Sequence, residues 1–195
     1  MDANGENNSD VSQLEEKDMN KQPGSVPFGY EPPADTEKGT LIYYDTFESS
    51  SEKEWDRVAD YAIERSFRRL VLYLIHEETA KRMSRKTPVS AYYKREARLS
   101  QWLEERGDPT VSIDGWEGKR KKYTPIDSAL RHLTETLPGP HFVYMTTDTA
   151  NSFASFSTFE SWIVNVRLLL PSEPKTAHPM LERYRHRWSP LVPLR

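Results

Sequence analysis

The fold depends on the stretch "LVLYLI", residues 70–75, the longest uninterrupted apolar run in the chain. Apolar or small residues before it recur every three or four positions, as on one face of a helix: Trp55, Ala59, Ala62, Ser66, Leu70 and Leu74. Ser51 and Glu54 fit a capping box at the start of this pattern. Because no glycine or proline interrupts it, we expect one long helix from residue 52 through the apolar run. A strand at residues 70–75 is the alternative.

The flanking segments predict further strands and helices. We expect strands at "GTLIYYDTF" (39–47), "TVSI" (110–113), "HFVYMTT" (141–147) and "SWIVNVRLLL" (161–170). Helices are expected from Thr87-Pro88 to Gly107, from Thr124-Pro125 to the "PGP" at 138–140, and within the basic segment 177–188.

Residues 148–160 are ambiguous. Their phenylalanines lie three apart, as on a helix, but their serine, threonine and phenylalanine content favours a strand and hence a β-meander. We therefore predict an α+β fold, with an antiparallel sheet of about four to five strands and three main helices packed on one face.

The charge distribution divides the chain into two parts. Residues 1–39 carry nine acidic and three basic side chains with few apolar residues, which is typical of a disordered acidic tail. Residues 40–195 are expected to form a single globular domain. Within it, residues 81–122 carry twelve lysines and arginines against six acids. This polarity indicates a basic face.

Composition excludes several classes of protein. The chain has no cysteine, so disulfide scaffolds, thiol catalysis and zinc fingers are ruled out. Its acidic N-terminal residues are unlike a secretory or mitochondrial leader, and its apolar runs are too short to cross a bilayer. We expect a cytoplasmic protein that does not bind membranes.

The known catalytic patterns are also missing from the sequence. The glycines at 107, 115, 118 and 139 form neither a dinucleotide-binding fingerprint nor a P-loop. "HEETA" at 76–80 lacks the second histidine of a zinc-protease helix. A serine hydrolase can be composed from Ser152, Ser155 or Ser157 with His132 and Asp148, but no glycine-flanked elbow supports it. We expect no cofactor, no metal and a binding protein in preference to an enzyme.

A binding surface is the remaining hypothesis, and it centres on "GWEGKRKK", residues 115–122. "GWEG" has the glycine spacing of the loop with which KH domains clamp nucleic acid. It follows a strand and carries Glu117, however, so no family is assigned. Exposed aromatic and basic side chains would serve a protein partner or a polyanion. The candidate residues are Trp116, Lys119, Arg120, Lys121, Lys122, Arg85, Lys94 and Arg98.

We expect a protein partner first, nucleic acid second and an unrecognised hydrolase third, and the oligomeric state is left open. The near-balanced charge of residues 40–195, 24 basic and 21 acidic side chains, weighs against nucleic acid. The question that the sequence poses is whether Trp116 faces solvent or core.

Overall fold

A computed structural model describes residues 38–83 and 88–192. Its strands are β1 (Lys38–Asp45), β2 (Phe67–Leu74), β3 (Val111–Asp114), β4 (His141–Tyr144), β5 (Val166–Leu170) and β6 (Trp188–Pro190). Its helices are α1 (Glu52–Glu64), α2 (Glu77–Met83), α3 (Tyr92–Arg106), α4 (Trp116–Arg120), α5 (Ile126–Thr136), α6 (Thr147–Ala154), α7 (Phe159–Ile163), α8 (Pro179–Arg183) and the 3-10 turn η1 (Arg185–Arg187). None of the helices in the described ranges has the length and apolarity to cross a membrane. The predicted tail, residues 1–39, lies outside the described residues except for Lys38 and Gly39, which begin β1.

The six strands form one sheet in the order β3-β2-β1-β4-β5-β6, and every pairing is parallel. The expected antiparallel sheet of four to five strands is therefore wrong. Parallel neighbours need a crossover, and helices supply it between successive strands. The chain adds strands on one side of β1 up to β3 and then returns to place β4 on the other side. The fold is a doubly wound α/β fold.

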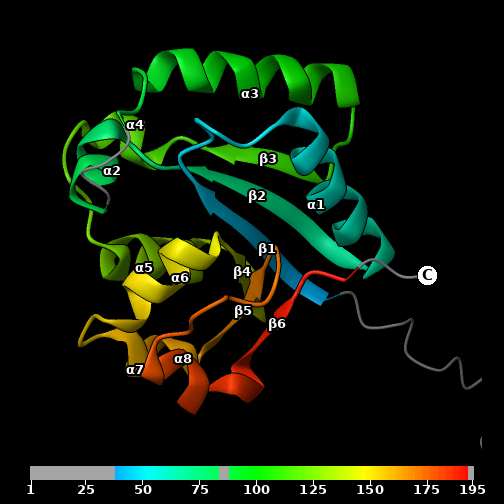
Figure 1. Cartoon of the computed structure of the whole chain (residues 1–195). Helices are drawn as coiled ribbons and strands as arrows, with labels where there is room; N and C mark the ends of the chain where they lie inside the picture. Colours follow the sequence, from blue (N-terminus) through cyan, green and yellow to red (C-terminus); the bar gives the residue numbers. More distant parts are fainter. Residues whose placement is uncertain (1–37, 84–87, 193–195) are drawn as a thin grey trace, which may run out of the picture. The chain divides into compact units, whose positions relative to one another are not determined.

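Helices cover both faces of this sheet, not one face as expected (Figure 1). Leu41 and Tyr43 of β1 pack in a core with side chains of α1 and α3. Ile42 and Tyr44, on the opposite face, pack in a second core with side chains of α5, α6, α7 and α8. Successive side chains of a strand point to opposite faces, so a strand covered on both sides is apolar throughout.

This double coverage explains the wrong prediction at residues 70–75. Residues 52–64 do form α1, capped by Ser51 as expected. The chain then turns at Ser66, which has a left-handed φ of 57°, and enters β2 at Phe67. A serine in this conformation gives no sequence signal, because glycine is the residue that usually takes it. The alternative of a strand at residues 70–75 is correct.

The predicted β-meander is also wrong. The segment at 148–160 falls largely within α6 and α7, and Phe153 and Phe159 are buried against each other with ring centroids 5.0 Å apart. The helical alternative was correct for most of this segment, although Phe156 lies between the two helices and is exposed. The other boundaries hold better: Gly107 ends α3 in a left-handed conformation, and α5 starts just after Pro125. The basic segment near residue 180 contains α8 and then β6 at the sheet edge.

Candidate functional site

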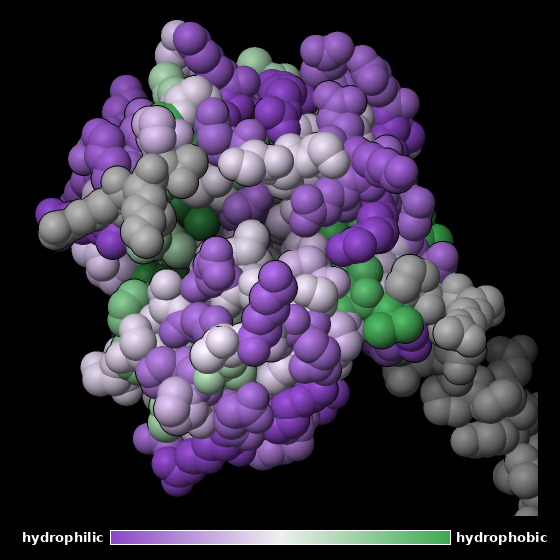
Figure 2. Space-filling view, in the orientation of Figure 1, coloured by the Kyte–Doolittle hydropathy of each residue, from purple (hydrophilic) through white to green (hydrophobic). Residues whose placement is uncertain are grey.

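A polar cleft lies where the strand order reverses, between the carboxyl ends of β1 and β4. Ligands of open α/β sheets bind at such switch points. The cleft, named here the switch-point cleft, has a volume of roughly 350 Å³. It is lined by Asp45, Thr46, Glu48, Ser49, Ser50, Glu54, Ile75, Ala80, Met83, Val89, Thr146, Asp148 and Thr149. The space-filling view shows the surface hollowed between the elements on the two faces of the sheet (Figure 2).

The loop after β1 forms one wall of the cleft. Ser50 donates a hydrogen bond to Asp45 (Oγ–Oδ2, 3.0 Å) and accepts one from the Trp55 indole (2.9 Å). Phe47 is fully buried and has a left-handed φ of 54°. This conformation is strained for an aromatic residue, and such strain often accompanies functional loops. Packing of the Phe47 ring against Tyr43 and Trp55 holds it in place.

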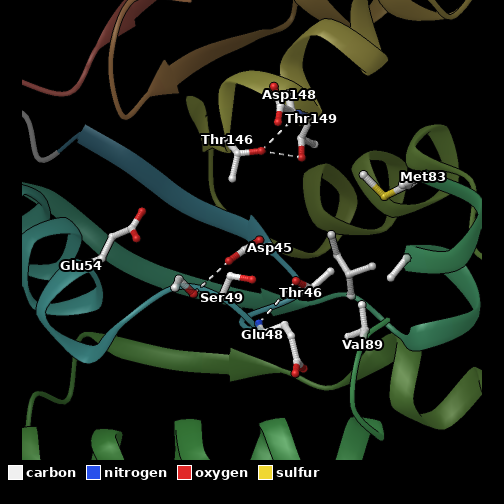
Figure 3. A pocket seen from close by; sticks show the side chains of 13 residues that line it. Asp45, Thr46, Glu48, Ser49, Glu54, Met83, Val89, Thr146, Asp148 and Thr149 are labelled. Carbon is white, nitrogen blue, oxygen red and sulfur yellow. Dashed lines mark hydrogen bonds between the residues drawn. The ribbon is translucent and has the colours of Figure 1, made fainter. Parts of the chain in front are cut away.

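The start of α6 forms the facing wall. Thr146 caps this helix by accepting a hydrogen bond from the Thr149 amide (3.1 Å). Asp148 lies in the first turn, where the helix dipole favours a carboxylate. Figure 3 shows Thr146, Asp148 and Thr149 on one side of the cleft and Asp45, Thr46, Glu48 and Ser49 on the other.

A buried arginine binds the backbone of two residues that line the cleft, Thr46 and Ile75. Arg95 of α3 is 2% exposed and donates hydrogen bonds to the carbonyl oxygens of Thr46 (2.6 Å), Ile75 (2.8 Å) and Ser90 (2.9 Å). Thr46 follows β1, Ile75 follows β2 and Ser90 precedes α3. Arg95 thereby holds three separate backbone segments at one place, and its guanidinium is also 3.3 Å from a carboxylate oxygen of Glu77.

The carboxylates of the cleft differ in their affinity for protons. Two hydrogen bonds from Ser90, from its hydroxyl (2.7 Å) and its amide (3.0 Å), lower the pKa of Glu48. Burial raises the pKa of Asp45, against the opposing effect of the Ser50 hydrogen bond. The cleft therefore holds one group that stays ionised and one that retains its proton to higher pH than an ordinary aspartate.

Among the described residues, the lining combines four carboxylates (Asp45, Glu48, Glu54 and Asp148) with no lysine, arginine or histidine. Ile75, Ala80, Met83 and Val89 supply an apolar part, and Met83 and Val89 close one end of the cleft (Figure 3). In the described ranges, no group of three or more acidic, histidine or cysteine side chains is arranged to hold a metal ion. The cleft can accept hydrogen-bond donors and positive charge beside an apolar surface.

Trp116, the central residue of the predicted binding surface, is neither freely exposed nor in the core. Its ring is partly buried and stacks on His132, with centroids 4.3 Å apart and planes within 5° of each other. Arg120 covers Trp116 at 4.4 Å, and His132 is hydrogen-bonded to Asp114 (2.9 Å). Trp116 thus joins α4 to α5.

Glu117 does not lie among the neighbouring cations. It is fully buried and accepts hydrogen bonds from the Tyr73 hydroxyl (2.9 Å), the His76 amide (2.9 Å) and the Thr79 hydroxyl (2.7 Å). Helix α4, which contains Glu117, is therefore anchored to β2 and α2 through this one carboxylate. Burial raises the pKa of Glu117.

The other predicted site residues are only partly brought together. Lys119 and Lys121 line a second cavity, and Lys122 is exposed beside them. Lys94 is exposed on α3, whereas Arg98 donates a hydrogen bond to the Ser50 carbonyl (2.6 Å). Arg85 lies outside the described residues.

The residues of the imagined hydrolase do not form a triad. His132 is bound to Asp114, whereas Asp148 lines the switch-point cleft, and Ser155 donates its hydroxyl hydrogen bond to the Ser152 carbonyl. Sequence reasoning missed Asp45, Glu48 and Thr146 as site residues. The available signal was the polar residues that directly follow two apolar strands, "YYD" at 43–45 and "YMTTD" at 144–148.

Comparison with known proteins finds no family model that matches the chain and no curated protein with significant similarity to it.

Proposed function

We propose that this protein binds a small organic cation in the switch-point cleft. The observation that carries the proposal is the charge of the described lining residues, which include four carboxylates and no basic side chain. A cleft with walls of one sign concentrates ligands of the opposite sign, because its low-dielectric surroundings focus the field. The nearest buried cation, Arg95, already has its hydrogen bonds to backbone carbonyls and Glu77.

The apolar part of the lining supports an organic ligand over a bare ion. Ile75, Ala80, Met83 and Val89 present hydrocarbon surface that only a molecule with carbon groups can use. A volume of roughly 350 Å³ is at the small end of the range for ligand pockets, which is about 300–1,000 Å³. We therefore favour a compact amine with one apolar group.

Phosphate-bearing ligands fit the same position poorly. A phosphate at a switch point is usually bound by a glycine-rich turn after the first strand. Here that turn is "TFESSS", residues 46–51, which has no glycine and places Glu48 in the cleft. Repulsion between this carboxylate and a phosphate opposes binding.

A set of three ligands that share a phenethyl group tests the proposal: phenethylamine, N-acetylphenethylamine and 3-phenylpropionate. Binding is measured by amide chemical-shift changes in two-dimensional NMR. We expect phenethylamine to bind with shifts at residues 45–50 and 146–149. We expect the neutral amide to bind at least about 10-fold more weakly, because a charged hydrogen bond contributes roughly 1.5–3 kcal/mol. Equal binding of the carboxylate would overturn the proposal.

Asp148→Asn is the variant to compare, since the structure gives this side chain no hydrogen-bond or ion-pair partner among the described residues. It should weaken phenethylamine binding several-fold and leave the amide unchanged. Glu135→Gln, on the exposed side of α5, is the control and should change neither. Loss of binding in both variants to the same extent would point to a general charge effect and refute a specific site.

The hypotheses of a protein partner and of a nucleic-acid partner stay predictions. Because Glu117 is buried, it does not lie on the surface beside Lys119, Lys121 and Lys122, which favours a polyanion more than the sequence indicated. Binding of DNA and RNA at low and physiological salt tests this second candidate, because phosphate contacts weaken steeply with salt.

A further inference from the structure

A second cavity of roughly 750 Å³ lies beyond the carboxyl ends of β2 and β3. It shares no lining residue with the switch-point cleft. The lining is His76, Glu77, Glu78, Tyr92, Tyr93, Glu96, Gly115, Gly118, Lys119 and Lys121. A ligand in this second cavity would therefore bind at a different site from the organic cation proposed above.

The cavity contains a buried hydroxyl with no partner. Tyr92 is 8% exposed, and its hydroxyl has no hydrogen bond to any residue in the described ranges. A buried polar group without a partner costs free energy, so its presence at a cavity indicates a missing partner. A Cβ atom built on Gly115 would lie 3.7 Å from this hydroxyl and 3.5 Å from Oε1 of Glu96. Both oxygens thus border the same space beside Gly115.

The two glycines of "GWEG" shape this space. A Cβ atom on Gly118 would lie 2.4 Å from Cε1 of Tyr92, so only glycine lets the tyrosine ring pack under α4. Gly115 has an ordinary negative φ and only van der Waals distances around its built Cβ. The backbone conformation therefore does not require glycine at position 115, and the absence of a side chain there leaves space in the cavity.

Two of the five charged side chains that line the cavity, Glu77 and Glu78, already have charged partners. Glu77 accepts hydrogen bonds from Arg95 and from the Tyr92 amide, and Glu78 forms an ion pair with Lys81. Three charged lining residues have no ion pair within the described part of the chain, namely Glu96, Lys119 and Lys121. The free charges are thus one carboxylate beside the unpartnered hydroxyl and two ammonium groups.

We propose that this cavity binds a free α-amino acid. The ligand's ammonium group donates to Glu96 and to the Tyr92 hydroxyl, and its carboxylate meets Lys119 and Lys121. Tyr93, 67% exposed at the cavity, offers an aromatic face to the ligand's side chain. A zwitterion uses both kinds of free charge, whereas a simple cation or a simple anion leaves one kind without a partner.

Calorimetric titration with phenylalanine, N-acetylphenylalanine and phenylalaninamide tests the proposal, because each derivative lacks one of the two charges. We expect phenylalanine to bind and each derivative to bind at least about 10-fold more weakly. If phenylalanine fails, the other standard amino acids are titrated in the same way. No binding of any of them at about 10 mM would overturn the proposal, as would equal binding of a derivative.

Variants locate the site. Tyr92→Phe removes only the unpartnered hydroxyl and should weaken binding about 5-fold or more, and Glu96→Gln should have the larger effect. Glu104→Gln, on the same helix, and Lys122→Ala, beside the cavity, are the matched controls and should bind like the wild type. Gly115→Ala should weaken binding without loss of stability. Undiminished binding by Tyr92→Phe and Glu96→Gln would refute the assignment of the ammonium position.

The two ligand sites are distinguished by one further measurement. Asp148→Asn, in the switch-point cleft, should leave phenylalanine binding unchanged, and Glu96→Gln should leave phenethylamine binding unchanged. Loss of phenylalanine binding in Asp148→Asn would place the amino acid in the switch-point cleft and overturn the assignment to the second cavity.

Discussion

Replacement of Glu117 by alanine should destabilise the fold strongly, although the residue belongs to a five-residue surface helix. Its carboxylate accepts hydrogen bonds from three donors that lie on β2 and α2 or directly between them: Tyr73, His76 and Thr79. All three donors are in buried residues. Glu117→Ala leaves each of them without its acceptor.

The magnitude follows from the number of orphaned donors. Each buried donor without a partner costs about 1–3 kcal/mol, and water entering the vacated space recovers part of this. Removal of a buried carboxylate, which desolvation already penalises, offsets another part. We expect a net loss of about 3–5 kcal/mol, a large share of the roughly 5–15 kcal/mol by which a domain is stable.

Urea denaturation followed by circular dichroism measures this loss. With a denaturant dependence of roughly 2 kcal/mol per molar, the midpoint should fall by about 2 M. Glu117→Gln keeps the shape and one acceptor oxygen, so it should lose only about 1–2 kcal/mol. Glu135→Ala, an exposed glutamate, should stay within about 0.5 kcal/mol of the wild type. A midpoint shift below about 0.5 M for Glu117→Ala would show that Glu117 does not anchor α4.

Three further predictions rest on other features. Because burial raises the pKa of Glu117 above its ordinary value of 4.5, the part of the stability that is linked to its retained proton is full below pH 4.5 and is lost as the pH rises through the folded-state value. The stability of the wild type relative to Glu117→Gln should therefore fall on that rise, and a flat difference in a pH series of urea melts would contradict it. Ser66→Gly relieves the left-handed conformation at an exposed turn and should add about 0.5–1 kcal/mol, while Ser100→Gly, within α3, should subtract a similar amount. Arg95→Lys keeps the charge but loses the fork that binds three carbonyls, and thermal melts should show a loss of about 2–4 kcal/mol, with Lys94→Arg unchanged.

The sequence predicted the three longest helices well and the sheet poorly, for one physical reason. Amphipathic helices show their buried face as a repeat of three or four residues, which identified α1, α3 and α5. Strands buried on both faces show no alternation, so β1 and β2 carried no information on direction or neighbours. Strand order then depends on the crossovers, and neither the turn at Ser66 nor the start of α2 was predicted from the sequence.

Candidate site residues could be predicted only where they are adjacent in the sequence. The basic residues 119–122 are adjacent in sequence, so composition found them. Asp45 and Asp148 are 103 positions apart and meet at one cleft because β1 and β4 are neighbours in a parallel sheet. An expectation of an antiparallel sheet places strand ends at opposite edges and hides this meeting. The position of Trp116 could not be predicted either, because no sequence pattern indicates that it stacks on His132, 16 positions away.

Arg95 determines which substitutions can report on the two cavities. Its guanidinium lies 3.8 Å from Glu48 of the switch-point cleft and 3.3 Å from Glu77 of the second cavity. A change at either glutamate disturbs the arginine and, through it, the ends of β1 and β2. Loss of binding after such a change would mix ligand contacts with altered backbone positions. Within the described part of the chain, neither Asp148 nor Glu96 forms a hydrogen bond or an ion pair with Arg95, so an effect of changing them reports on the ligand itself.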